Sequence, residues 1–111
     1  MKIITICGSL RFQAEMVSVA EQLELVGNVV LVPIIPTREL DGYTEENIRI
    51  FGEMHKERIK LSDAIFVVNV GGYVGNATKG EIEFAKALNK EILYYTDWLH
   101  DAKIVGRNVE K

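Results

Sequence analysis

The hydrophobic positions of this chain fall into two kinds of run. Short, nearly continuous apolar runs rich in β-branched residues predict strands, and they occupy residues 2–7, 28–33, 64–70 and 91–95. Longer segments, in which apolar residues recur every three or four positions, predict amphipathic helices over residues 11–27, 44–64 and 77–89. Gly52 predicts a pause in the second helix, and the pattern assigns no element from residue 96 onward.

Strands that alternate with helices indicate a parallel sheet with right-handed crossovers. We therefore expect a single small α/β domain over residues 1–111, doubly wound in the Rossmann or flavodoxin-like manner, with about four or five strands in the order 2-1-3-4. Such sheets bind ligands beyond the carboxyl ends of their strands, where the strand order reverses. The loops that follow the first and third strands should meet there, and they read CGSLRF and GGYVGNATKGE.

Charge and composition narrow the classes of partner. The net charge is −3, from 13 basic and 16 acidic residues, and no basic tract indicates nucleic-acid binding. No apolar run approaches the roughly 18 residues of a membrane span, and a strand that starts at residue 2 leaves no room for a signal peptide. The single cysteine, Cys7, agrees with a reducing compartment, so we expect a cytoplasmic protein. Spacing alone does not let His55 and His100 build a metal site with Cys7.

The first loop offers an anion site at the start of a helix. Gly8 allows a tight turn, Ser9 supplies a hydroxyl group, and Arg11 adds charge beside the free helix amides. These residues can contact a phosphate or a ribose, or Ser9 can simply cap the helix. The loop matches neither the dinucleotide-binding glycine pattern nor a Walker loop.

Glu81, at the end of the second loop, admits two interpretations. Thr78 and Glu81 have the spacing of a capping box, in which both side chains bond to helix amides. Alternatively, the many glycines indicate close approach of a ligand, and Glu81, kept ionised by the helix dipole, is a nucleophile for glycosidic-bond cleavage. The other candidate substrate-binding residues of this loop are Asn69, Gly72, Tyr73 (by stacking on a base), Gly75, Asn76 and Thr78.

Three segments resemble the nucleoside 2-deoxyribosyltransferase superfamily, which includes deoxynucleoside 5′-monophosphate N-glycosidases. They read CGSLRF, SDAIFVVNVGGY and TKGEIEFAKALNKEIL, and the resemblance spans residues 3–95. It implies that Glu81 attacks the anomeric carbon and releases the base, with Ala85 four residues later as the family pattern has it. It also implies that the first loop contacts a 5′-hydroxyl or 5′-phosphate group, that no cofactor is needed, and that the chain forms a homo-oligomer. Aromatic residues at positions 94, 95 and 98 are candidates for that interface.

The chain departs from the family pattern at two positions. His55 and Gly75 stand where active relatives carry aspartates. A histidine can donate a proton to a leaving base, but the interpretation we favour slightly is an exposed helix residue. Asp63 lies at the opposite end of the sheet and is interpreted as structural.

The leading hypothesis is an enzyme that cleaves or transfers at the N-glycosidic bond of a nucleoside or nucleoside 5′-monophosphate. Glu81 is its nucleophile, His55 its candidate acid, and no metal is implied. A non-catalytic nucleotide-binding module of the same fold is the main alternative. The first loop also resembles the phosphate loop of flavodoxin-like FMN reductases, which is the third hypothesis.

Overall fold

A four-stranded parallel sheet forms the centre of the molecule. The computed structural model describes residues 1–104, and for residues 100–104 it describes the backbone alone. The sheet has the order β2-β1-β3-β4, and every neighbouring pair is parallel. The predicted α/β class and strand order are therefore confirmed. The strands are β1 (Ile3–Cys7), β2 (Val29–Leu31), β3 (Ala64–Val67) and β4 (Glu91–Tyr94).

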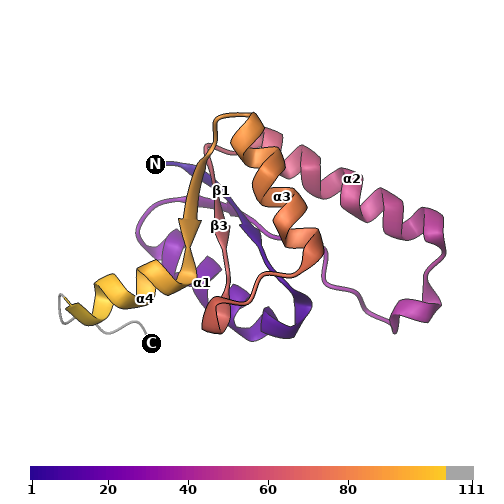
Figure 1. The fold of residues 1–111 in the computed structure, drawn as a ribbon, viewed down its shortest axis with the longest axis horizontal. Helices are drawn as coiled ribbons and strands as arrows, with labels where there is room; N and C mark the ends of the chain where they lie inside the picture. Colours follow the sequence, from indigo (N-terminus) through magenta and orange to yellow (C-terminus); the bar gives the residue numbers. More distant parts are fainter. Residues whose placement is uncertain (105–111) are drawn as a thin grey trace.

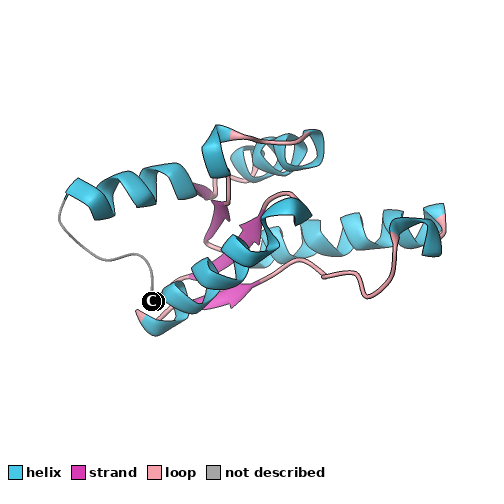
Figure 2. Cartoon of the chain, turned by 90° about the horizontal axis from the view of Figure 1, so that it is seen from below, coloured by secondary structure: helices cyan, strands magenta, loops and turns pink. Residues whose placement is uncertain are grey.

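Helices cover both faces of this sheet (Figures 1 and 2). Side chains alternate along β1, so that Ile4 and Ile6 pack towards one face and Cys7 towards the other. The first face is covered by α1 and α4, and the second by α2 and α3. The α-helices are α1 (Gln13–Leu25), α2 (Glu45–Leu61), α3 (Asn76–Ala87) and α4 (Tyr95–Ile104). Three 3-10 turns precede α1, α2 and α3: η1 (Leu10–Phe12), η2 (Leu40–Gly42) and η3 (Val70–Gly72).

Helix α2 is continuous, so the predicted pause at Gly52 is wrong. Thr44 caps the helix reciprocally with Asn47, and the helix then runs unbroken to Leu61. A glycine inside a helix costs about 1 kcal/mol relative to alanine. Burial of His55 and Ile59 against the sheet offsets that cost and holds the helix through this position.

Helix α3 begins before the predicted capping box, and the capping interpretation of Glu81 is therefore wrong. Gly75 is the N-cap residue, without any side-chain capping bond, so Thr78 is the third helical residue and Glu81 the sixth. Glycines in the preceding loop serve the chain itself. Gly71 and Gly72 have φ of +64° and +84°, which favours glycine, and a Cβ atom on Gly75 would lie 3.3 Å from the Tyr73 hydroxyl.

The C-terminal segment, which the hydrophobic pattern left unassigned, forms α4. Trp98 packs edge-on against Phe66 with ring centroids 6.0 Å apart, and Tyr95 also joins this face of the core. Tyr94 packs on the opposite face. The aromatic residues expected at a subunit interface thus have partners within their own chain. Within residues 1–104, no helix is both long and apolar enough to cross a membrane.

Candidate functional site

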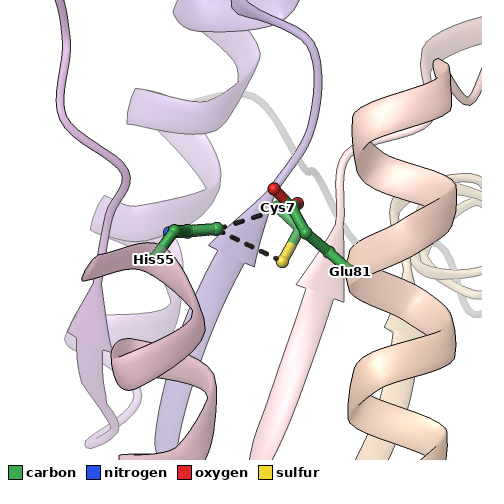
Figure 3. A group of neighbouring side chains, drawn as sticks. All are labelled: Cys7, His55 and Glu81. Carbon is green, nitrogen blue, oxygen red and sulfur yellow. Dashed lines mark hydrogen bonds and ion pairs between the residues drawn. The ribbon is translucent and has the colours of Figure 1, made fainter. Parts of the chain in front are cut away.

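Three side chains from distant parts of the sequence meet at the carboxyl end of β1 (Figure 3). Cys7 is the last residue of β1, His55 comes from α2 and Glu81 from α3. The Nε2 atom of His55 lies 3.6 Å from the Cys7 Sγ atom and 3.8 Å from the Glu81 Oε1 atom. This group, called the Cys7–His55–Glu81 cluster below, lies at the sheet edge where parallel folds bind ligands.

A cavity of about 280 Å³ opens next to the cluster. His55 and Glu81 line it, together with Gly8 at the end of β1 and Arg58 from α2. Its remaining wall is mainly apolar and comes from the loop between β2 and α2 and from the first half of α2. The residues of this wall include Pro33, Ile34, Pro36, Leu40, Tyr43, Ile48 and Phe51.

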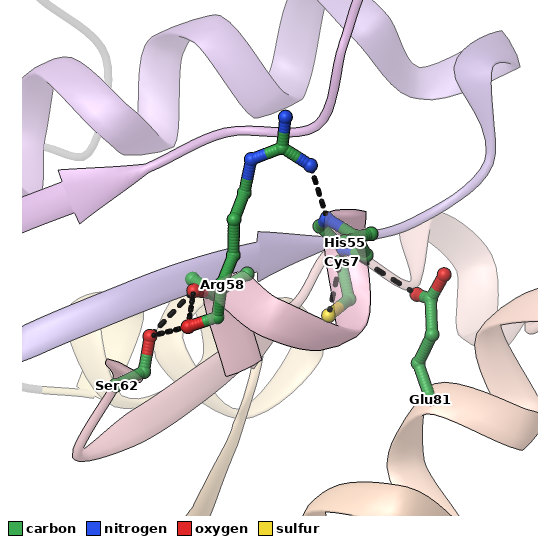
Figure 4. Close-up of polar contacts among 6 residues, drawn as sticks. Cys7, His55, Arg58, Ser62 and Glu81 are labelled. Atoms are coloured by element: carbon green, nitrogen blue, oxygen red, sulfur yellow. Dashed lines mark hydrogen bonds and ion pairs between the residues drawn. The ribbon is translucent and has the colours of Figure 1, made fainter. Parts of the chain in front are cut away.

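His55 is buried, so the expectation of an exposed helix histidine is wrong. Its side chain is only 7% exposed. Burial, and secondarily the positive charge of Arg58, lowers the pKa of His55 from 6.5 to about 4. The Nη1 atom of Arg58 lies 3.2 Å from the other ring nitrogen, Nδ1 (Figure 4). At neutral pH the imidazole is therefore uncharged and is hydrogen-bonded to Arg58.

Glu81 is a carboxyl group in a mostly buried position. Burial raises the pKa of Glu81 from 4.5 to about 7, and the neighbouring Cys7 has a smaller, opposite effect. The sequence analysis expected the helix dipole to keep Glu81 ionised. The effect of desolvation is larger, so the carboxyl group is not fully ionised at neutral pH. Among the described side chains, no lysine or arginine forms an ion pair with Glu81. About a quarter of the side chain, 23%, is exposed, and the residue lines the cavity.

Cys7 contributes a protonated thiol. Burial, and then the charge of Glu81, raises the pKa of Cys7 well above its ordinary value. The side chain is fully buried at the end of β1. It packs as a small buried residue, and the sequence analysis did not foresee its position inside the cluster.

The atoms of this cluster belong to the types that bind zinc. A cysteine sulfur, a histidine nitrogen and a carboxylate oxygen lie within 4.8 Å of one another. A metal would require a thiolate and an unprotonated Nε2 atom. Burial opposes the thiolate, and Arg58 donates to Nδ1, which leaves the imidazole proton on Nε2. Without an ion, the side chains are therefore held as a hydrogen-bonded cluster, whereas a bound cation would itself favour the thiolate. Chain spacing did not reveal that these three residues meet.

One residue of the first loop that was predicted to bind a ligand lines the cavity, and the other two do not. Gly8 lines the cavity, whereas the Ser9 hydroxyl accepts a hydrogen bond from the Arg11 amide and so caps η1. The Arg11 guanidinium lies 4.2 Å from the centre of the Tyr73 ring, and Phe12 packs edge-on against the same ring. The loops after β1 and β3 thus meet as predicted. Arg11 and Tyr73 contact each other outside the residues that line the cavity.

The other predicted contacts of the second loop do not line the cavity either. Asn69 is buried and exchanges two hydrogen bonds with Thr96, which ties the end of β3 to the start of α4. Asn76 is exposed at the start of α3, and Thr78, two residues later in the helix, is buried. Asn69, Asn76 and Thr78 therefore belong to the structure of the loop and the helix start. Gly72 and Gly75 allow the backbone of the turn described above.

Sequence reasoning missed Arg58 and the apolar wall. The wall could have been found from the apolar residues that interrupt the loop after β2. Ile34 and Leu40 remain substantially exposed although they are large and hydrophobic. Exposed apolar residues that gather in one patch often mark a binding site. Arg58 carried no comparable signal, because one basic residue near the end of a helix is ordinary.

Comparison with models of known protein families finds no match for this sequence, and no curated protein matches it. Neither comparison assigns the chain to a family. The resemblance to the deoxyribosyltransferase superfamily stays a prediction.

Proposed function

We propose that this protein cleaves or transfers at the N-glycosidic bond of a nucleoside or a nucleoside 5′-monophosphate, with Glu81 as the nucleophile. One observation carries this proposal: Glu81 is a largely buried carboxyl group, with no lysine or arginine paired to it among the described residues, and it faces a cavity at the carboxyl edge of the sheet. A carboxylate beside a cavity that can hold a sugar has the chemistry of a glycosidase nucleophile.

The reaction has two steps. A carboxylate oxygen of Glu81 attacks C1′ of the sugar, the C1′–N bond breaks, and its electron pair leaves with the base, which takes up a proton. The resulting glycosyl ester is then attacked at C1′ by water or by a second base, and the carboxylate is released. Water makes the protein a hydrolase, and a second base makes it a transferase. The first step needs ionised Glu81, which is about half populated near pH 7.

His55 acts in this proposal through Glu81 rather than as the acid. Its pKa of about 4 leaves it uncharged at neutral pH, so it has no readily transferable proton for the leaving base. Its Nε2 atom lies 3.6 Å from Cys7 Sγ and 3.8 Å from Glu81 Oε1, so the ring is a direct neighbour of the carboxylate. The leaving base takes its proton from solvent.

The apolar wall of the cavity supplies a surface for the base. Tyr43 and Phe51 pack edge-to-face with centroids 5.3 Å apart, and both line the cavity. Aromatic side chains bind flat heterocycles through their faces and edges. We propose this pair for the base contact that the sequence analysis assigned to Tyr73.

Base release from a panel of nucleosides and their 5′-monophosphates tests the proposal. We expect Glu81→Gln to reduce release by on the order of 10³-fold or more, because the amide cannot act as the nucleophile. The matched control is Glu83→Gln, which changes a carboxylate on the same helix that is 75% exposed, and it should retain full activity.

Three outcomes count against the proposal. Equal release by the native protein and Glu81→Gln excludes Glu81 as the nucleophile. No release from any substrate by folded native protein, together with nucleotide binding, favours the non-catalytic binding module. A yellow protein on purification favours the FMN reductase.

A further inference from the structure

The contact between Arg58 and His55 determines which imidazole nitrogen carries the proton. Arg58 Nη1 lies 3.2 Å from His55 Nδ1 (Figure 4). A guanidinium group has only donors, so Nδ1 must be the acceptor. A neutral imidazole has one proton, and that proton then resides on Nε2.

The Nε2 proton points into the cluster. Cys7 Sγ lies 3.6 Å from Nε2, and Glu81 Oε1 lies 3.8 Å from it. A donor that faces a carboxylate stabilises its ionised form. The opposite tautomer would present a lone pair at the same place, and it would favour protonated Glu81 as a donor to the ring. The tautomer of His55 therefore affects whether the carboxylate is available.

The charge of Arg58 acts in the same direction. The charged or titratable groups that face His55 are Arg58 from its own helix, Cys7 from β1 and Glu81 from α3. The nearby guanidinium disfavours a second positive charge on the ring. Without Arg58, an imidazolium–carboxylate pair could form, and it would engage the oxygen that faces the ring.

We propose that Arg58 is a positioning residue that holds His55 as the neutral Nε2–H tautomer, so that the ring presents an N–H group to Cys7 and faces Glu81 with that donor instead of a lone pair. Its effect on catalysis rests on the proposed function. The tautomer itself does not, because it can be measured without substrate. Arg58 thus acts on Glu81, the proposed nucleophile, indirectly through His55.

The main chain of Arg58 has a separate role that substitutions preserve. Its carbonyl oxygen accepts hydrogen bonds from Thr5 Oγ1 at 3.1 Å and Ser62 Oγ at 2.8 Å. The bond from Thr5 joins α2 to β1, and the bond from Ser62 lies at the end of α2; neither depends on the side chain at position 58. Arg58→Met therefore removes the guanidinium while it keeps this anchor and most of the apolar stem.

Nitrogen-15 NMR of the imidazole rings, recorded between pH 3 and 8, tests the proposal. The chain has two histidines, and a His55→Gln sample identifies the His55 signals. In the native protein we expect the Nε2–H tautomer and a midpoint near 4. In Arg58→Met we expect a mixture of tautomers and a midpoint that moves up towards 6.5, the ordinary value. Arg58→Lys, which keeps a cationic donor, should restore part of the native behaviour.

The control is Arg49→Met, which removes an exposed arginine of the same helix that pairs with Glu46. It should leave the His55 signals unchanged. An Nδ1–H tautomer in the native protein overturns the proposal without any variant, as does an unchanged tautomer and midpoint in Arg58→Met. Where base release is detected, Arg58→Met should lower kcat by roughly 10-fold with little change in KM. Absence of base release refutes the proposed function and leaves the NMR result to decide on Arg58.

Discussion

The opposed pKa shifts of Glu81 and His55 predict that their effects on stability cancel in the native protein. Folding raises the pKa of Glu81 from 4.5 to about 7, so between these values the folded state holds a proton that the unfolded state lacks. Its contribution to stability is lost as pH rises through that window. Folding lowers the pKa of His55 from 6.5 to about 4, so the unfolded state holds the extra proton. Its contribution appears as pH rises from 4 to 6.5.

The two contributions have similar size. Each pKa moves by about 2.5, and about 1.4 kcal/mol per pKa unit converts this to about 3 kcal/mol for each group. The sum is a stability that changes little between pH 4 and 7. Replacing one residue should expose the contribution of the other.

Glu81→Gln should therefore gain about 3 kcal/mol in the free energy of unfolding between pH 4 and 7, because only the His55 contribution remains. His55→Gln should lose a similar amount between pH 4.5 and 7, because only that of Glu81 remains. Urea unfolding at pH 4, 5.5 and 7 measures both. The fluorescence of Trp98, the single tryptophan, reports unfolding because its ring packs on Phe66.

Glu83→Gln is the control and should reproduce the native profile, since Glu83 is exposed. Parallel pH profiles of the free energy of unfolding for the native protein and Glu81→Gln would refute the reasoning. They would mean that Glu81 has the same pKa in the folded and unfolded states. A rise with pH in His55→Gln would refute it as well. Either result would also remove the electrostatic basis for a reactive carboxyl group at this position.

Two further predictions concern the pH dependence of base release and the contact between Asn69 and Thr96. Base release should rise with pH through about 7 and then level off, because the nucleophile must be ionised. Values of kcat/KM between pH 5.5 and 8.5 measure this dependence. A fall in kcat/KM over that range would indicate that Glu81 acts as an acid. Asn69→Ala should reduce the free energy of unfolding by about 1–3 kcal/mol, because both side-chain bonds to Thr96 are lost in a buried place. Urea unfolding tests it against Asn76→Ala, an exposed control; equal stability of the two variants would contradict the anchoring role of Asn69.

The fold could be predicted from the sequence because it depends on local and repeating features. Continuous apolar runs identify strands buried on both faces, and apolar residues at helical spacing identify the helices that cover them. Parallel crossovers of one hand then leave few possible strand orders. The same reasoning placed Glu81 and the loop after β1 at the ligand edge of the sheet. Helix ends were less predictable, since α3 begins at Asn76 through its backbone and uses no side-chain cap.

The candidate site depended on contacts between distant segments. His55 is separated from Cys7 by 48 residues, and only the packing of α2 on β1 brings their side chains to 3.6 Å. Burial then changes the chemistry of each group, because the removal of water disfavours a charge on either Glu81 or His55. A sequence lists titratable residues but does not give their solvation or their neighbours. The chain alone thus determined the sheet and the edge at which parallel folds bind ligands. The tertiary structure decided that Arg58, His55, Cys7 and Glu81 form one polar cluster there.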